Sequence, residues 1–300
     1  MRSKPTCFRI GTRASKLALA QTNLAIEYLK KQGIDFNYQI KTISTHGDQD
    51  QLTPLHKMKV SGSFVSTIQQ ALFDKRIDGA IHSLKDLPSQ DSDGLTTIIL
   101  DMPIDPFDGL ISKHHLDFEA LPYGCTIASS SLRRQACIYH KRKDIHFIDM
   151  RGNIDTRLTK LNNDPTIDAI ILATAGLNRI DKKDMITQVL DPSWMIPACG
   201  QGALAFQCRC EDVEWFEPLV SMVHTKTYDG CIMARRFLQQ TKAGCHQPVG
   251  FYAMYEHNHW HIDAMVGTTI ENCRFLHFDT DEHDLDQIVS RTVKRLEERS

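Results

Sequence analysis

The stretch Gly79-Ala80-Ile81-His82-Ser83-Leu84-Lys85-Asp86-Leu87-Pro88 joins a short apolar run to two charged residues and a proline. The apolar run predicts a buried strand over 79–84, and the charged pair predicts a loop at the carboxyl end of that strand. Ligands of open α/β sheets bind in the crevice beyond the carboxyl ends of the strands. Asp86 is therefore a candidate catalytic carboxylate at the floor of a cleft, although an ordinary loop ion pair with Lys85 explains the spacing equally well.

Short apolar strands and amphipathic helices alternate on both sides of this stretch, which indicates α/β units with largely parallel sheets. Further strands are expected at 8–10, 38–43 and 96–100, with a helix that begins at the N-cap residue Ser15. A second set of strands is expected at 125–128, 145–149 and 168–173. The apolar run 203–206 can return the chain to the first sheet.

Three domains follow from this pattern. Domain 1 is expected to comprise residues 1–102 and 200–222, and domain 2 residues 103–199, with a hinge at the proline-containing segment 102–106. Domain 3, residues 223–300, is expected to be a small α+β domain with strands near 251–255, 260–266 and 274–278 and a last helix from about Asp284.

Composition excludes several functional classes. The 300 residues include 35 Lys and Arg against 37 Asp and Glu, so no global field draws the protein to nucleic acid. No apolar run approaches the roughly 18 residues of a membrane helix, and Arg9, Arg13 and Lys16 interrupt any signal-peptide core. Nine cysteines without a framework spacing favour reduced thiols and a cytoplasmic protein.

Three successive strand ends of the second set carry arginine together with small polar residues, at 129–134, 151–153 and 173–179. Guanidinium groups bind carboxylates and phosphates, and helix N-termini add free backbone N–H groups. Arg13 and Ser15, after the first strand, would face these loops. A solvated basic surface is the simpler alternative, but the repeated position at strand ends favours a cleft for a polyanion.

Cys245 lies in a loop between Gly244 and Pro248, beside His246, and such neighbours can lower the pKa of a thiol. One cysteine among nine is more often inert, so this signal is weak by itself.

His257, His259 and His261 alternate along an expected strand and could chelate a metal. A solvent-facing side of the strand explains these histidines more simply, and no metal is predicted.

Together, these motifs resemble the porphobilinogen deaminase family, also called the hydroxymethylbilane synthase family. The matching segments are Arg9 to Ser15, Thr45 to Asp48, His82 to Pro88, Ser129 to Gln135, Arg151 to Asn153, Ile170 to Ala173, Pro197 to Gly202 and Gly244 to Gly250. The resemblance covers residues from about 8 to 250, and the last fifty residues match only in pattern.

The resemblance implies two α/β domains similar to type II periplasmic binding proteins around a cleft, plus the small third domain. It also implies a monomer with a dipyrromethane cofactor, joined through a thioether to Cys245. The implied reaction condenses four porphobilinogen molecules head to tail, releases ammonia each time, and ends with hydrolysis to hydroxymethylbilane.

The resemblance also assigns roles to individual residues. Asp86 would be the catalytic carboxylate that stabilises the positive azafulvene formed when ammonia departs. The groups that hold cofactor carboxylates would be Lys85, Ser129, Ser131, Arg133 and Arg134. The groups that hold the substrate or the growing chain would be Arg13, Ser15, Arg151, Arg157, Arg179 and Gln201.

The sequence departs from the family pattern in the lid segment 57–64, which has few glycines, and at Phe107, where arginine is usual. Two other functions therefore stay open. A solute-binding protein would share the two-domain cleft but would normally carry a secretion signal and would not need Cys245. A non-catalytic paralogue could retain pyrrole binding without turnover.

Overall fold

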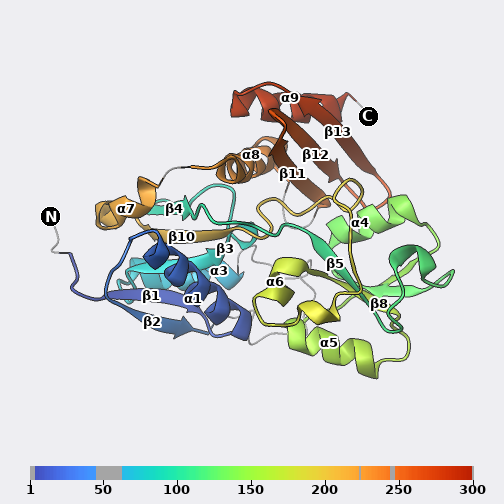
Figure 1. Ribbon diagram of the computed structural model, residues 1–300, viewed down its shortest axis with the longest axis horizontal. Coiled ribbons are helices and arrows are strands. Elements are labelled where there is room, and N and C mark those ends of the chain that lie inside the picture. The colour runs from blue at the N-terminus through green and yellow to red at the C-terminus, as the bar shows by residue number, and fades with distance from the viewer. Residues whose placement is uncertain (1–3, 45–62, 223, 244–246, 299–300) are drawn as a thin grey trace.

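The protein is described by a computed structural model over residues 4–44, 63–222, 224–243 and 247–298. Within these residues the chain forms three sheets. The first sheet lies at the left of Figure 1 with α1 in front of it, the second lies at the right, and the third lies above them with α8 and α9. The predicted α/β class with a small C-terminal α+β unit is confirmed.

The first sheet has the strand order β2-β1-β3-β10-β4. Its strands are β1 (Phe8–Arg13), β2 (Tyr38–Ile43), β3 (Gly79–Ser83), β4 (Leu95–Ile99) and β10 (Leu204–Arg209). β1 runs parallel to β2 and β3, whereas β10 is antiparallel to β3 and β4. Every residue of β10 is buried, as expected for a strand that is covered on both faces. The helices of this part are α1 (Lys16–Lys31), α3 (Ser63–Phe73) and α7 (Glu217–Val220), the last preceded by a 3-10 segment, Cys210–Phe216.

The second sheet repeats this arrangement with the strand order β7-β6-β8-β5-β9. Its strands are β5 (Asp108–Ser112), β6 (Thr126–Ala128), β7 (His146–Ile148), β8 (Ala169–Ala173) and β9 (Gln188–Val189). β6 is parallel to β7 and β8, and β5 is antiparallel to β8. Its helices are α4 (Leu132–Lys141), α5 (Ile154–Asn163) and α6 (Thr174–Asn178), with short 3-10 turns at Phe118–Ala120 and Lys183–Met185.

The third sheet is antiparallel and consists of β11 (Val249–Glu256), β12 (His259–Gly267) and β13 (Cys273–Thr280). Helices α8 (Lys226–Thr241) and α9 (Leu285–Glu297) pack against it. Trp260 and Phe237 lie at the centre of this core, and both side chains are fully buried. The opposite face of the sheet contacts the second sheet's core through Met265.

Helix starts follow the capping residues in the sequence. Ser15 is the N-cap of α1 and accepts a hydrogen bond from Ala18 N at 3.2 Å, as predicted. Ser131 caps α4 in the same way, and Asn153 caps α5 by accepting from Thr156 N at 2.8 Å. These caps fix the loops at the carboxyl ends of β1, β6 and β7.

Three local predictions were wrong. The strand expected over 79–84 ends at Ser83, because Leu84–Asp86 turns into a 3-10 helix. Strand β5 was not expected, since its first residues, Asp108 and Gly109, are poor strand formers. His257 does not share a strand face with His259 and His261, because it lies in the β11–β12 turn with a positive φ of 49°.

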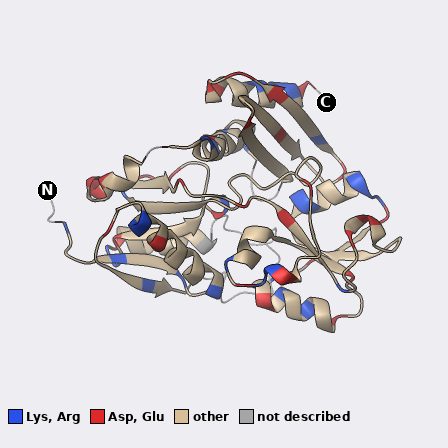
Figure 2. Ribbon diagram, viewed as in Figure 1, with Lys and Arg blue, Asp and Glu red and all other residues tan. Residues whose placement is uncertain are grey.

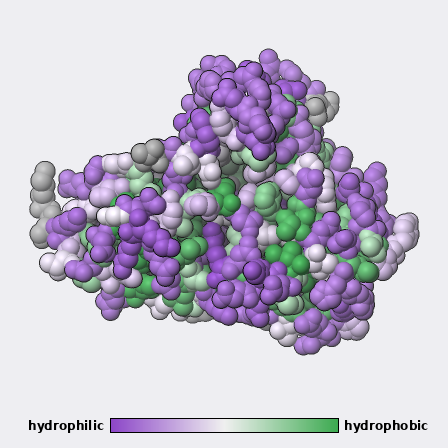
Figure 3. All heavy atoms as spheres, viewed as in Figure 1, coloured by the Kyte–Doolittle hydropathy of each residue, from purple (hydrophilic) through white to green (hydrophobic). Residues whose placement is uncertain are grey.

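Two chain segments, 100–107 and 190–203, connect the first sheet to the second. A cavity of about 210 Å³ lies where these segments meet α8 and β11, and its walls include Phe107 and Tyr252, whose rings contact edge to face. In the view of Figure 3 the upper part of the surface, over the third sheet, is mostly hydrophilic, whereas patches of hydrophobic atoms show on the lower left and lower right parts. Among the described residues, no helix combines the length and apolarity needed to span a bilayer.

Candidate active site

Asp86 ends the 3-10 turn that follows β3, and its side chain is exposed. It lines a small cavity of about 60 Å³ together with Arg13, the last residue of β1, and Ser15, the N-cap of α1. The ends of two parallel neighbouring strands therefore bring together a carboxylate, a guanidinium and a helix N-terminus.

Lys85 lies in the turn that directly follows β3 and donates a hydrogen bond from Nζ to Oε1 of Gln201 at 3.1 Å, in the segment that returns from the second sheet. The side chain is reached by solvent, yet it is surrounded by protein on the cleft walls. Desolvation there lowers the pKa of Lys85 to about 8, against the attraction of Asp86 and with the repulsion of Arg134. A bound anion would therefore stabilise the protonated form of Lys85.

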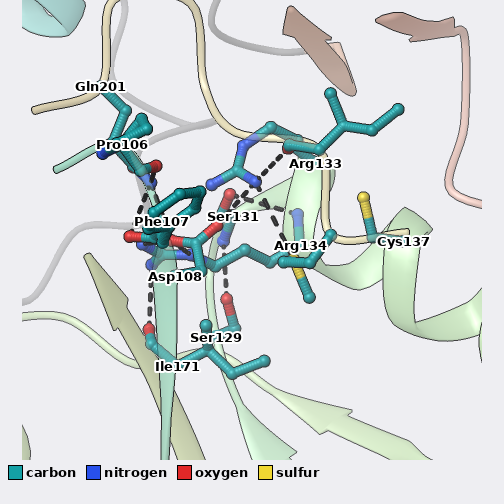
Figure 4. Close-up of polar contacts among 12 residues, drawn as sticks. Pro106, Phe107, Asp108, Ser129, Ser131, Arg133, Arg134, Cys137, Ile171 and Gln201 are labelled. Carbon is teal, nitrogen blue, oxygen red and sulfur yellow. Dashed lines mark hydrogen bonds and ion pairs between the residues drawn. The ribbon is translucent and has the colours of Figure 1, made fainter. Parts of the chain in front are cut away.

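Asp108, at the start of β5, is completely buried and binds two arginines of α4 (Figure 4). Its Oδ2 lies 2.8 Å from Arg133 Nη1, and its Oδ1 lies 2.7 Å from Arg134 Nη2. Burial alone would raise the pKa of Asp108, but the charges of Arg133 and Arg134 outweigh it and hold this pKa well below its usual range. One carboxylate thus anchors two guanidiniums at the cleft wall.

The remaining donors of the two arginines differ in what they contact. Arg134 Nη1 donates to Ile171 O at 2.9 Å, so this side chain is tied to the protein on both sides. Arg133 Nη1 donates to Ile196 O at 2.6 Å. Ser129 and Ser131 lie at the start of α4, where Ser129 Oγ accepts from Ser131 N at 3.3 Å.

Gln201 connects Lys85 to this buried cluster. While its Oε1 accepts from Lys85, its Nε2 donates to Asp108 Oδ1 at 3.1 Å and to Pro106 O at 2.7 Å. Gln201 is 2% exposed and lies in the segment that returns to the first sheet, whereas Pro106 lies in the outgoing one. The two connecting segments and the two cleft walls therefore meet at one side chain.

Arg151 and Arg157 extend the positively charged wall of the cleft along the loop after β7 and into α5, where Figure 2 shows acidic as well as basic residues. Arg157 Nε donates to Gly152 O at 2.8 Å. Desolvation, followed by the like charges of Arg134 and Arg151, lowers the pKa of Arg157 to about 10. Arg157 is half-buried, and a desolvated guanidinium with cationic neighbours is a setting in which a bound carboxylate is favourable.

Arg179 follows a different pattern from the other predicted substrate arginines. It is the C-cap of α6, and its Nη2 donates to the carbonyl oxygen of Gly202 in the returning segment. Burial lowers the pKa of Arg179, and the charge of Asp105, in the outgoing segment, opposes this effect only in part. The structure therefore connects Arg179 to the two connecting segments, apart from the Asp108 cluster.

Some predicted features lie outside the described residues: the cofactor cysteine Cys245 and most of the lid segment 57–64. Of the three histidines considered as metal ligands, His261 contacts Asp279 at 2.7 Å and His259 contacts Asp281. Within the described ranges, no group of three or more His, Cys, Asp or Glu is arranged to hold a metal ion.

Sequence reasoning missed two buried residues of this site, Asp108 and His82. Asp108 follows the proline-containing hinge segment, and an acid at the start of an apolar run was the available signal. His82 lies in the strand that was predicted to be buried, and it is buried, but nothing in the sequence pattern assigned it a role in the site.

Comparison with known proteins places this site in a family. A family model described as "Porphobilinogen deaminase, dipyromethane cofactor binding domain" matches residues 8–217. The chain is 46% identical over 252 residues to the porphobilinogen deaminase of Staphylococcus carnosus, which covers 83% of this chain and 81% of that protein. The chain belongs to the porphobilinogen deaminase family. The porphobilinogen deaminase of Alkaliphilus metalliredigens is 41% identical over 262 residues, covering 87% of this chain and 82% of that protein.

Membership of the porphobilinogen deaminase family confirms the predicted family, the transferase class and the dipyrromethane cofactor. Among solved structures, a YaeC-family lipoprotein of Enterococcus faecalis is similar, with a TM-score of 0.44 and 14% identity over 80% of this chain and 98% of that one.

Proposed function

We propose that this chain is a hydroxymethylbilane synthase that condenses four porphobilinogen molecules head to tail, releases ammonia at each step and hydrolyses the product from the enzyme. The observation that carries the proposal is the cleft itself. The exposed carboxylate of Asp86 shares a cavity with Arg13, and Lys85, Arg133, Arg134 and Arg157 supply further positive charge that Asp108 only partly balances.

The positive charge of the cleft is complementary to the negative charge of the dipyrromethane cofactor. Dipyrromethane carries carboxylate side chains, and when bound it supplies the pyrrole carbon onto which the chain is built. The lowered pKa values of Lys85 and Arg157, about 8 and about 10, mark cations that protein acids leave undercompensated. We assign cofactor carboxylates to Lys85, Ser129, Ser131, Arg133 and Arg134. We assign the substrate and growing chain to Arg13, Ser15, Arg151, Arg157, Arg179 and Gln201.

Asp86 is the residue to which we assign the catalytic role. Porphobilinogen develops positive charge on its ring as ammonia leaves, and a carboxylate held beside that ring lowers the energy of the charged state. The neighbouring cations bind the ring's own carboxylates, so the substrate is oriented while Asp86 remains available.

Cys245 is proposed to hold the cofactor through a thioether. The described residues that flank its loop support this proposal, because β11 begins beside the cleft wall. Phe251 N donates to Pro197 O at 3.1 Å, and the carbonyl oxygen of Ile196, the residue before Pro197, accepts a hydrogen bond from Arg133.

Intact-protein mass spectrometry tests the attachment. The purified chain should carry a dipyrromethane adduct that is absent from Cys245→Ser, and Cys231→Ser is a matched control because Cys231 is a buried thiol of α8. An unmodified parent that turns over porphobilinogen fully would refute the attachment.

A second test separates the enzyme from a non-catalytic paralogue. Asp86→Asn removes the charge but keeps the shape, so turnover should fall on the order of a hundredfold or more while the fold persists. Near-parental turnover would contradict the role of Asp86, and a parent without turnover would favour the paralogue.

The three-domain division stated from the sequence, with domain 1 at 1–102 and 200–222, remains our proposal for the units that move during elongation. We also propose a cytoplasmic monomer. The cysteines among the described residues are all free thiols, which suits a reducing compartment. Sedimentation equilibrium at a mass of 34.1 kDa is the expected result for a monomer.

A further inference from the structure

His82 lies on β3, four residues before Asp86, and is 8% exposed. Its Nε2 is buried and has no hydrogen-bond partner among the described residues. Burial, and then the charge of Arg13, lower the pKa of His82 to about 4, so the imidazole is neutral at neutral pH. A buried polar atom without a partner costs free energy, and folded proteins rarely retain one without a reason.

The small cavity that contains Asp86 supplies such a reason. His82 lines this cavity with Arg13, Ser15 and Ser83. The other neutral polar side chains of this cavity already have hydrogen-bond partners. Gln21 Nε2 donates to Ser83 Oγ at 2.9 Å, and Ser15 caps α1. The wall of this cavity therefore includes a histidine with an unused hydrogen-bonding nitrogen, together with a cation and a carboxylate.

The neutrality of His82 matters for the chemistry next to it. The substrate becomes positive as ammonia leaves, so an additional cation beside Asp86 would raise the energy of that state. A neutral imidazole can still donate one hydrogen bond to a carboxylate without adding charge. Arg13, on the same cavity, supplies the charge that attracts the carboxylate.

We propose that His82 is a substrate-binding residue, which donates a hydrogen bond from Nε2 to a side-chain carboxylate of the porphobilinogen ring bound next to Asp86. The proposal rests on the proposed function and specifies one contact within it. The imidazole of His82 is then in the tautomer that carries its proton on Nε2. The bound carboxylate accepts the hydrogen bond that this buried nitrogen otherwise lacks.

The test compares His82→Gln with His82→Phe in steady-state turnover of porphobilinogen by the holoenzyme. Phenylalanine fills the same space without a donor, so KM should rise about tenfold while kcat stays within about twofold, since a hydrogen bond to a charged group is lost. Glutamine provides an amide donor and should recover most of the loss. His114→Phe and His114→Gln, at an exposed loop position, are matched controls that should leave KM unchanged.

A purely structural His82 predicts the opposite order. An apolar ring would then be the better replacement, so His82→Phe would keep the parental KM, and His82→Gln would have the lower melting temperature. That order, or a fall in kcat with an unchanged KM, would overturn the proposal. If the parent itself does not turn over porphobilinogen, the proposed function fails, which the parent assay reports separately.

A second measurement needs no change at His82. In Asp86→Asn chains with ¹⁵N-labelled histidine, adding porphobilinogen should shift the His82 Nε2 resonance and slow exchange of its proton, while the His114 signals stay in place. If the ring binds and the His82 resonance does not move, the contact does not exist.

Discussion

The guanidinium of Arg134 donates two hydrogen bonds to one oxygen of Asp108, from Nε at 3.1 Å and from Nη2 at 2.7 Å. Both side chains are buried, and Arg133 adds a second cation to the same carboxylate. Removing one member of a buried ion pair leaves the others without compensation, whereas an exposed pair contributes little. Asp108 is therefore the shared counter-ion that stabilises both arginines in the wall of the cleft.

Asp108→Asn should lower the free energy of unfolding by about 3–5 kcal/mol, because it leaves two buried guanidiniums without their counter-ion. Urea denaturation measures the change. The exposed pair of Asp74 and Arg76, at 3.3 Å, offers the control Asp74→Asn, which should change stability far less. Similar losses for the two variants would contradict the role given to Asp108.

The same carboxylate predicts the shape of acid unfolding. The pKa of Asp108 is lower in the folded than in the unfolded chain, so its contribution is complete above the unfolded pKa of about 3.9 and is lost as pH falls toward the folded pKa. Below about pH 4 the stability of the parent should therefore fall more steeply than that of Asp108→Asn. Parallel curves from pH 5 to pH 2 would exclude this linkage.

Lys85 should titrate well below an ordinary lysine in the cofactor-free chain, with a pKa of about 8, because its charge is desolvated between the cleft walls. NMR of lysines labelled at the ε-carbon should show one resonance that titrates near this pH and disappears in Lys85→Arg. Loading the cofactor should raise the pKa of Lys85, since carboxylates favour the protonated amine. If every lysine titrates near its ordinary value, the cleft is more hydrated than the structure indicates.

Arg157→Met should leave the cofactor-free fold at least as stable as the parent while raising KM about tenfold, because the arginine is desolvated among like charges that only a ligand relieves. Arg134→Met is the matched control on the same wall. It should destabilise the fold strongly, since it takes one of two cations from the buried Asp108. Thermal unfolding measures the stability of both variants, and steady-state kinetics measures their KM. Equal destabilisation by the two substitutions would contradict the ligand-binding role of Arg157.

The alternation of strands and helices predicted the α/β class, since β3 and β8 are almost completely buried strands followed by a helical turn. The start of α1 was also predictable, because serine is a preferred N-cap residue and Ser15 caps this helix. Strand β5 was not predictable from its residues, because it forms only when β8 and β9 lie on either side of it. Tertiary pairing outweighed local propensity there.

The site was predictable as a set of strand-end residues but not as a set of partners. Arg133 and Arg134 are adjacent in sequence and were expected to have the same role. Both bind Asp108, yet Arg133 also donates to Ile196 O, whereas Arg134 donates to Ile171 O. Which donors remain for a ligand depends on Asp108, 25 or more residues earlier in the chain, and no local pattern carries that information.

The position of β10 between β3 and β4 has a consequence for how the chain is made. On the ribosome, β1 to β4 emerge first, but β4 pairs only with β10 among the described strands, so the first sheet stays open until residue 209 has been synthesised. The second sheet, by contrast, is built from the continuous span 108–189. The later-made half can therefore close before the earlier one, and a nascent chain that pauses before residue 204 presents an unpaired edge to chaperones and to other chains.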